Sequence, residues 1–337
     1  MSALQQLLVT PEKAAEMILS GATLTIAGDE SVLANLPRGN WIGGTTAYFM
    51  GQDGGVTTRE QLFVTPLPSY SGFTPSIKQY DAASLSQVCV EAPANGFSVI
   101  IMPAFSEVHF HYAQHASMYD EMFMKPLVGW ISGIHLDDMG KRTPKVRDGR
   151  NGALLENRAL AIHVPLPENV SANVNIVNLF TQGKGDVLEF SESGFEASVC
   201  LVNGKPTSLA SYLKDIGHDI RLPLVADYSG AIINVSLKAV DQARDKVEFY
   251  GPVFPHVAYK LAQPFAGSYE TAFSQAVADL PQQAGFSCNC ILNYLYSGLE
   301  GKRTGHVTGP MTFGEVAYVL LNQTMVHLTL ETYRAAC

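Results

Sequence analysis

Short apolar runs bounded by glycine, proline or polar residues recur along the chain, and this pattern limits the fold more than any other feature of the sequence. Runs of this length and punctuation are typical of β-strands. They are most frequent after residue 158, at residues 159–165, 173–180, 187–190, 197–203, 230–237, 246–250, 257–261, 287–292 and 325–330. Long β segments with few helices between them predict an α/β fold of the mixed α+β kind, with mixed β-sheets covered by helices.

The first half of the chain alternates strand-like and helix-like segments. Strands are expected at residues 24–27, 41–45, 62–67, 97–102 and 126–132. A helix is predicted over residues 11–19, because Thr10 can cap it and Pro11 suits its first turn. Further helices are expected after Ser106 and at residues 208–214, 268–280 and 313–321. The polar stretch 137–152 is the clearest loop, and no short internal repeat is visible.

The charge content excludes two classes of protein. Only 16% of the residues are Asp, Glu, Lys or Arg and 47% are hydrophobic, whereas a disordered chain is rich in charge and poor in hydrophobic residues. The chain has 22 basic and 31 acidic residues, so its net charge is −9. Nucleic-acid binding depends on a basic face that neutralises phosphates. We therefore expect a folded protein with no nucleic-acid partner.

The sequence also indicates where the protein resides. No run approaches the ~18 apolar residues of a membrane helix, and the first residues lack the basic and apolar segments of a signal peptide. The five cysteines are an odd number and are not spaced as a disulfide framework. These observations predict a cytoplasmic protein with reduced thiols and no membrane partner.

The segment Gly43-Gly44-Thr45-Thr46 follows an expected strand with two glycines and two hydroxyl groups. Glycine lets a ligand approach the backbone amides closely, and threonine can hydrogen-bond to that ligand. A glycine-rich turn at the end of a strand explains the same residues without a ligand. Both interpretations stay open.

Cys288 and Cys290 flank Asn289 on another expected strand, so both thiols face one way and the amide faces the other. Buried, inert thiols are the simpler interpretation. A reactive Cys288 would need a cation or a helix N-terminus to lower the pKa of its thiol. The sequence identifies no base for such a nucleophile.

Thr312 and Glu315 have the spacing of a capping box at the start of the helix expected at residue 313. The free amides of the segment Thr312-Phe313-Gly314 could hold an anion there. A capping role explains Glu315 without a ligand and competes with a catalytic role for its carboxylate.

Glu107, His111 and His115 fall on one face of the helix expected after Ser106. Two imidazoles four residues apart, with a carboxylate, can ligate zinc or a similar metal. Haem is a second cofactor that His109, His111 or His115 could hold. A polar helix face explains the same spacing without a metal.

Several segments, in order, resemble motifs of the FIST family of ligand-sensing domains (F-box and intracellular signal transduction). In the first half these are Gly43-Gly44-Thr45-Thr46-Ala47 and Pro126-Leu127-Val128-Gly129. In the second half they are Val202-Asn203-Gly204-Lys205-Pro206, Val247-Glu248-Phe249-Tyr250-Gly251-Pro252-Val253, Phe286-Ser287-Cys288, Gly309-Pro310-Met311-Thr312-Phe313-Gly314-Glu315-Val316-Ala317 and Asn322-Gln323-Thr324. The chain departs from the family pattern at Thr45, Trp130 and Cys290.

The resemblance implies two modules, residues 1–195 and 196–337, and a sensor that binds a small polar or anionic ligand in a cleft between them. The residues expected to line the cleft are Gly43, Gly44, Thr45, Thr46, Cys288, Asn289, Thr312, Phe313 and Gly314. A separate signalling partner protein is also implied. Some family members bind haem, but no histidine here matches a family motif. An enzyme with Cys288 as nucleophile, and a haem or metal protein using His109, His111 or His115, are the alternatives.

Overall fold

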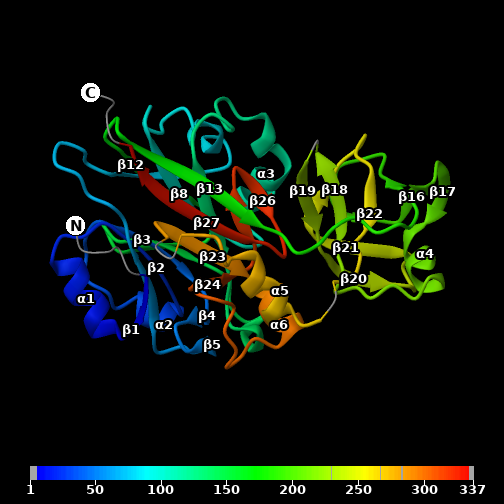
Figure 1. Ribbon diagram of the computed structural model, residues 1–337, viewed down its shortest axis with the longest axis horizontal. Helices are drawn as coiled ribbons and strands as arrows, with labels where there is room; N and C mark the ends of the chain where they lie inside the picture. Colours follow the sequence, from blue (N-terminus) through cyan, green and yellow to red (C-terminus); the bar gives the residue numbers. More distant parts are fainter. Residues whose placement is uncertain (1–5, 229, 266, 282–283, 334–337) are drawn as a thin grey trace.

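The computed structural model describes residues 6–333 except 229, 266, 282 and 283. It has an elongated shape, with a large body and a smaller lobe at one end (Figure 1). The lobe is formed by residues 188–261, coloured green to yellow, and helix α1 (Pro11–Leu19) lies at the far side of the body. Helices and strands are both present, as expected, but the strands outweigh the short helices, which do not clearly cover the sheets.

The body contains three six-stranded sheets. The first has the order β1 (Leu7–Val9), β6 (Leu62–Pro66), β2 (Leu24–Gly28), β3 (Trp41–Thr45), β10 (Val146–Asp148) and β11 (Ala153–Leu155). The second has the order β7 (Ser76–Tyr80), β12 (Ala159–Pro165), β8 (Gly96–Pro103), β9 (Leu127–Ser132), β25 (Glu315–Ala317) and β26 (Val319–Leu321). The third has the order β13 (Val170–Val177), β27 (Met325–Thr332), β23 (Phe286–Cys290), β24 (Gly309–Thr312), β4 (Tyr48–Gly51) and β5 (Gly54–Thr57).

The three sheets follow one pairing scheme. In each, the third and fourth strands are parallel and every other pair is antiparallel. A parallel pair needs a crossover connection, and a helix provides it each time. These helices are α2 (Glu30–Leu33), α3 (Glu107–His115) and α6 (Ile291–Ser297). The body is therefore built from three repeats of one topology that the sequence does not reveal.

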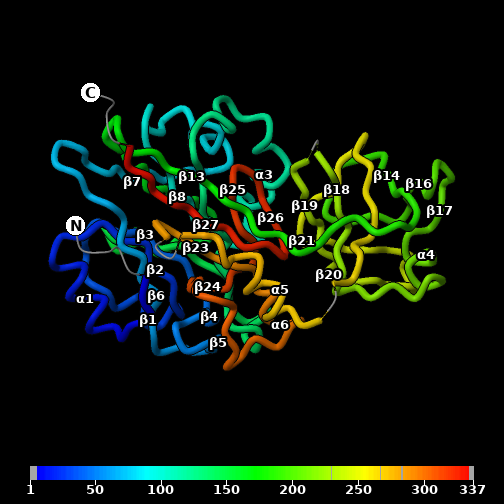
Figure 2. Tube along the Cα trace, in the orientation of Figure 1, coloured from blue at the N-terminus to red at the C-terminus, as the bar shows by residue number. Residues whose placement is uncertain are grey.

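The first repeat consists of β1–β6, the second of β7–β12, and the third of β13 with β23–β27. Each repeat gives one hairpin to the sheet of another repeat, so that the three exchanges close a ring. The β10–β11 hairpin of the second repeat completes the first sheet, the β25–β26 hairpin of the third completes the second sheet, and the β4–β5 hairpin of the first completes the third sheet. Figure 2 shows the consequence, because the orange β24 lies beside the blue β4. Strand pairing thus does not follow the expected division at residues 195 and 196.

The lobe is inserted into the third repeat, between β13 and β23. Its larger sheet has the order β17 (Lys205–Ser208), β16 (Val199–Val202), β14 (Leu188–Glu189), β22 (Tyr259–Leu261), β18 (Leu224–Tyr228) and β19 (Ala231–Val235). Its smaller sheet has the order β15 (Gly194–Ala197), β21 (Lys246–Val253) and β20 (Leu237–Asp241). Helix α4 (Leu209–Asp215) packs in the same apolar core through Leu209 and Leu213.

The helix signals in the sequence were largely correct. Helix α1 (Pro11–Leu19) has the predicted bounds, with the Thr10 side chain accepting from the Lys13 amide at its start. Helix α5 (Tyr269–Ala276) is capped in the same way by Ser268. No helix within the described ranges is long and apolar enough to cross a membrane.

Two expectations near the C-terminus are wrong. The helix expected at residues 313–321 is the hairpin of β25 and β26, whose turn contains Tyr318 at φ +64°. Pairing of Glu315 with Trp130 and of Ala317 with Val128 makes this segment extended, so tertiary pairing overrides the helical spacing. The strand expected through residue 292 ends at Cys290, and α6 begins at the next residue, Ile291.

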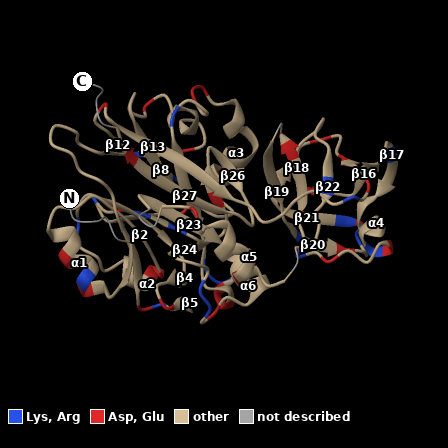
Figure 3. Cartoon of the chain, in the orientation of Figure 1, with Lys and Arg blue, Asp and Glu red and all other residues tan. Residues whose placement is uncertain are grey.

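An apolar core joins the three sheets at the centre of the body. Ile42 from the first, Trp130 from the second and Phe286 from the third belong to the same buried cluster. The rings of Trp130 and Phe286 are stacked with centroids 5.7 Å apart. Many of the charged residues belong to helices α1 and α4 and to the loops (Figure 3).

Candidate functional site

The turns singled out in the sequence meet where the three repeats join. The Gly133 amide donates to the Thr45 carbonyl at 2.7 Å, and the Phe313 amide donates to the Ile131 carbonyl at 3.0 Å. The Thr46 hydroxyl donates to the Met311 carbonyl at 2.9 Å. The structure therefore brings the two predicted halves of the site together, although they are more than 260 residues apart in the sequence.

Most of these residues are buried rather than exposed to a cleft. The buried members are Gly43, Gly44, Thr45, Thr46, Cys288, Asn289, Thr312 and Gly314. Among the residues predicted to line the cleft, only Phe313 lines a cavity in the part of the chain that the structure describes. The expected polar cleft is thus replaced at this position by packed backbone and side chains, which hold the repeats together.

The capping box at Thr312 is wrong, because no helix starts there. The Thr312 hydroxyl donates to the carbonyls of Asn289 and Gly314, at 3.2 and 3.1 Å. The Glu315 carboxylate instead accepts from the amide and hydroxyl of Thr324. No helix N-terminus is available at residues 312–314 to bind an anion.

Cys288 lacks the surroundings of a nucleophile. Its side chain is buried, and Sγ donates to the Gly129 carbonyl at 3.3 Å. Burial, reinforced by the nearby Glu315 carboxylate, raises the pKa of this thiol well above its ordinary value. A thiol in this state is protonated at neutral pH and unreactive.

The residues proposed as metal ligands share helix α3 but have other partners. Glu107 accepts from the Asn157 side chain at 3.0 Å, and the Nδ1 of His111 lies 2.8 Å from the Tyr119 hydroxyl. The Nδ1 of His115 lies 2.9 Å from the His111 carbonyl. Within the described residues, no three His, Cys, Asp or Glu side chains are grouped so that they could hold a metal ion.

A cavity of about 310 Å³ lies where the lobe meets the body. The body contributes α3, α6, Phe313 and the loop 133–145, and the lobe contributes residues of β15, β20 and β21. Aromatic and aliphatic side chains form most of its wall, while Lys238 and Glu248 of the lobe form an ion pair at 2.8 Å. Its lining residues include Phe105, His109, Phe110, Phe195, Leu292 and Phe313.

His109 is the one polar side chain of α3 that lines this cavity, and its donor has no partner. The Phe105 amide donates to Nδ1 at 3.2 Å, so the ring proton is on Nε2. Nε2 is buried without a hydrogen-bond partner in the part of the chain that the structure describes. Burial lowers the pKa of His109 to about 4, so the ring is neutral at pH 7. A buried N–H without an acceptor is costly.

The aromatic walls fix the orientation of that ring. His109 stacks on Phe110 with centroids 5.4 Å apart, and Phe195 of the lobe meets His109 edge-on at 6.3 Å. Phe110 and Phe195 are themselves 4.9 Å apart in a T-shaped pair. The lobe therefore contacts the imidazole directly, and the shape of the cavity depends on the position of the lobe relative to the body.

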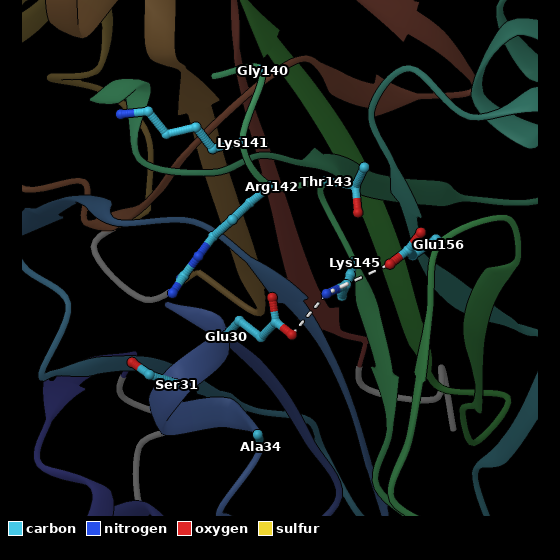
Figure 4. Close-up of a pocket in the computed structure, with 9 residues that line it drawn as sticks. All are labelled: Glu30, Ser31, Ala34, Gly140, Lys141, Arg142, Thr143, Lys145 and Glu156. Carbon is cyan, nitrogen blue, oxygen red and sulfur yellow. Dashed lines mark hydrogen bonds and ion pairs between the residues drawn. The ribbon is translucent and has the colours of Figure 1, made fainter. Parts of the chain in front are cut away.

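The loop 133–145 extends the site beyond this cavity. It joins β9 to β10, whereas residues 46–47 and 313–314 make the equivalent connections in the other repeats. Long loops on a rigid scaffold commonly carry function. Two further cavities, of about 350 and 710 Å³, lie along this loop. Figure 4 shows the larger one, in which Lys145 forms ion pairs with Glu30 at 2.7 Å and with Glu156 at 3.5 Å.

Sequence reasoning considered His109 only as a haem or metal ligand and missed its unpartnered Nε2. It also missed a chain of hydrogen bonds from the buried Ser98 through His163 and Tyr80 to the exposed Glu91, with links of 2.7, 2.9 and 2.7 Å. Ser98 and His163 resemble a catalytic pair, but both are buried and neither lines a cavity described here. The chain of bonds satisfies its own members and needs no substrate.

Residues 9–331 match the model of a protein family described as a family of unknown function, DUF6976. No curated protein matches the chain.

Proposed function

Since the chain belongs to this family of unknown function, its function has to be argued from its own residues, and we propose that it binds a small molecule in the cavity between lobe and body. The ligand has an apolar, ring-sized part between Phe110, Phe195 and Phe313, and an acceptor for the Nε2 proton of His109. This is ligand sensing of the kind that the FIST resemblance implies, with the ligand at a different place from the one expected.

The unpartnered Nε2 of His109 carries this proposal. Its ring is 4% exposed and lines a cavity of about 310 Å³, which is within the size range of small-molecule sites. Sites of this kind combine apolar walls with a few placed polar groups. The neutral His109, with its proton on Nε2, suits the carbonyl, ether or hydroxyl oxygen of an aromatic or cyclic ligand.

The position of the cavity supports sensing rather than catalysis. Phe195 and Tyr250 belong to the lobe, whereas His109 and Leu292 belong to the body. A ligand that contacts both parts favours the arrangement of lobe and body in which it binds. The described walls of this cavity hold no serine, threonine or cysteine. An intracellular location and a separate signalling partner are parts of the same proposal.

A thermal-stability screen tests the proposal. Cyclic compounds with one hydrogen-bond acceptor are compared with matched compounds that lack it. A ligand at 100 times its Kd adds about 2.7 kcal/mol to the free energy of unfolding, so hits are expected among the acceptor-bearing compounds. The variant His109→Phe keeps an aromatic ring and removes the donor. It should weaken binding about tenfold, the value of one hydrogen bond.

The matched control is His115→Phe, which makes the same change on the same helix outside the cavity. This variant should bind the hits as the original protein does. Equal stabilisation by both compound sets, or equal binding by His109→Phe, would contradict the proposal.

A further inference from the structure

The cavity beside His109 is one end of a longer groove along the loop 133–145. It shares the wall residues Ala104, Phe105 and Met139 with the cavity of about 350 Å³. That middle cavity shares Arg142, Thr143 and Glu156 with the outer cavity of about 710 Å³. The three spaces are therefore neighbours in series.

The chemistry of the wall changes along the groove. The inner end is formed mainly by aromatic and aliphatic side chains, whereas the outer end holds Glu30, Lys141, Arg142, Lys145 and Glu156. Figure 4 shows that Lys145 lies between the two carboxylates of this set. Since Glu30 and Glu156 both pair with Lys145, neither their charge nor that of Lys145 is free for a ligand.

Arg142 is different, because its guanidinium makes no hydrogen bond within the described part of the protein. The carboxylates closest to it are those of Asp29 at 3.8 Å and Asp138 at 3.9 Å. Both are already held, Asp138 by Arg59 at 2.7 Å and Asp29 by the hydroxyl of Ser31 at 2.8 Å. The two carboxylates restrain the guanidinium by charge but leave its N–H donors available. Arg142 also lines both the middle and the outer cavity.

We propose that the ligand is an elongated molecule with an apolar ring at the His109 end and an anionic oxygen group at Arg142. This inference rests on the proposed function and names the class of its ligand. The planar guanidinium, with its fork of N–H donors, matches the oxygens of a carboxylate or a phosphate. Met139 and Phe105, which line both the inner and the middle cavity, would contact the chain that connects the two ends.

Titration calorimetry with ω-phenylalkanoates of three to eight carbons tests the inference, alongside the primary amides and the ω-phenylalkyl phosphates of the same lengths. We expect an optimum chain length at which the carboxylate or the phosphate binds at least tenfold more tightly than the amide. Whichever of the two binds more tightly identifies the anionic group. In Arg142→Gln that anion should bind no better than the amide, while the amide keeps its affinity.

Lys141→Gln is the matched control, because it removes the same charge from the adjacent residue, which lines only the outer cavity. It should change the affinity of the anion by less than twofold. An anion preference that survives in Arg142→Gln, or that is lost equally in Lys141→Gln, overturns the inference. Binding of all probes without a preference for the anions also overturns it and leaves the proposed function standing. If no probe binds the original protein, both fail.

Discussion

Glu315 and Thr324 form a buried pair in which one carboxylate oxygen, Oε2, accepts both the backbone amide at 3.2 Å and the hydroxyl at 2.8 Å. The other oxygen, Oε1, is buried without a partner among the described residues. Burial raises the pKa of Glu315 to about 8, although the bonds from Thr324 oppose this shift. The carboxyl group is therefore largely protonated in the native protein at neutral pH.

This pair predicts the pH dependence of stability. Between pH 4.5 and about 8 the native protein holds a proton on Glu315 that the unfolded chain has released. The contribution of this group to the free energy of unfolding therefore falls as pH rises through that window. Glu315→Gln keeps a neutral acceptor for Thr324 and removes the titration. We therefore compare the free energies of unfolding of the two proteins. The value for Glu315→Gln minus the value for the original protein should increase by a few kcal/mol between pH 5 and pH 8.

Urea denaturation of both proteins at pH 5, 6.5 and 8 provides the measurement. The control is Glu16→Gln, which removes the carboxylate of an exposed glutamate of α1 and shows what the same substitution does outside the core. A constant difference between Glu315→Gln and the original protein would show that Glu315 is ionised in the native state.

Gly44 is expected to be required for packing rather than for ligand contact. A Cβ at this position would lie 2.7 Å from Ile101 and 2.9 Å from Nε1 of Trp130. Gly44→Ala should therefore cost about 1–3 kcal/mol, as overpacked cores do. Gly185→Ala, whose Cβ would meet nothing within 4 Å, is the control and should be nearly neutral. Chemical denaturation gives both values, and a neutral Gly44→Ala would argue against the tight junction of the repeats.

The thiols are expected to react slowly in the folded protein. Cys89, Cys200, Cys288 and Cys290 are free and buried, and burial raises the pKa of Cys89 and of Cys200 to about 11. Cys337 lies outside the described residues, so the experiment uses the Cys337→Ser background. Maleimide labelling should be slow without urea and should accelerate as the protein unfolds. Rapid labelling of Cys288 in the native protein would contradict this expectation and would support a nucleophilic role for Cys288.

An amide cluster is expected to hold the lobe on the body. The side chains of Asn178 and Asn234 exchange hydrogen bonds of 2.9 and 3.0 Å, and Asn234 also donates to the Asn322 carbonyl at 3.1 Å. Asn234→Ala leaves these buried groups unpaired and should cost about 1–3 kcal/mol. Asn175→Ala is the control, because no side-chain hydrogen bond of Asn175 is found in the described ranges. Denaturation and limited proteolysis of the segment 178–187 provide the readouts, and equal behaviour of both variants would exclude this role.

The sequence by itself determined the local structure wherever a strong local signal exists. Thr10 and Pro11 fixed the start of α1, and the mainly apolar run at residues 97–102 became the buried strand β8. A helix-capping residue and the spacing of apolar side chains depend on only a few neighbouring residues, so both can be recognised in the sequence without knowledge of the rest of the fold. The low charge and the many apolar runs likewise determined that the chain folds into a strand-rich body.

Only the tertiary structure decided which of the candidate functional residues are core residues and which line a cavity. Thr312 and Glu315 have helical capping spacing, yet pairing of β25 with β9 turned Glu315 toward Thr324. Gly44 and Cys288 became core residues because a second sheet packs against each of them: Ile101 and Trp130 lie against Gly44, and the Cys288 thiol donates to the Gly129 carbonyl. His109 became a candidate donor because the Phe105 amide occupies one ring nitrogen and the lobe encloses the ring. Such contacts join residues far apart in sequence, and their energies depend on burial, which no local pattern records.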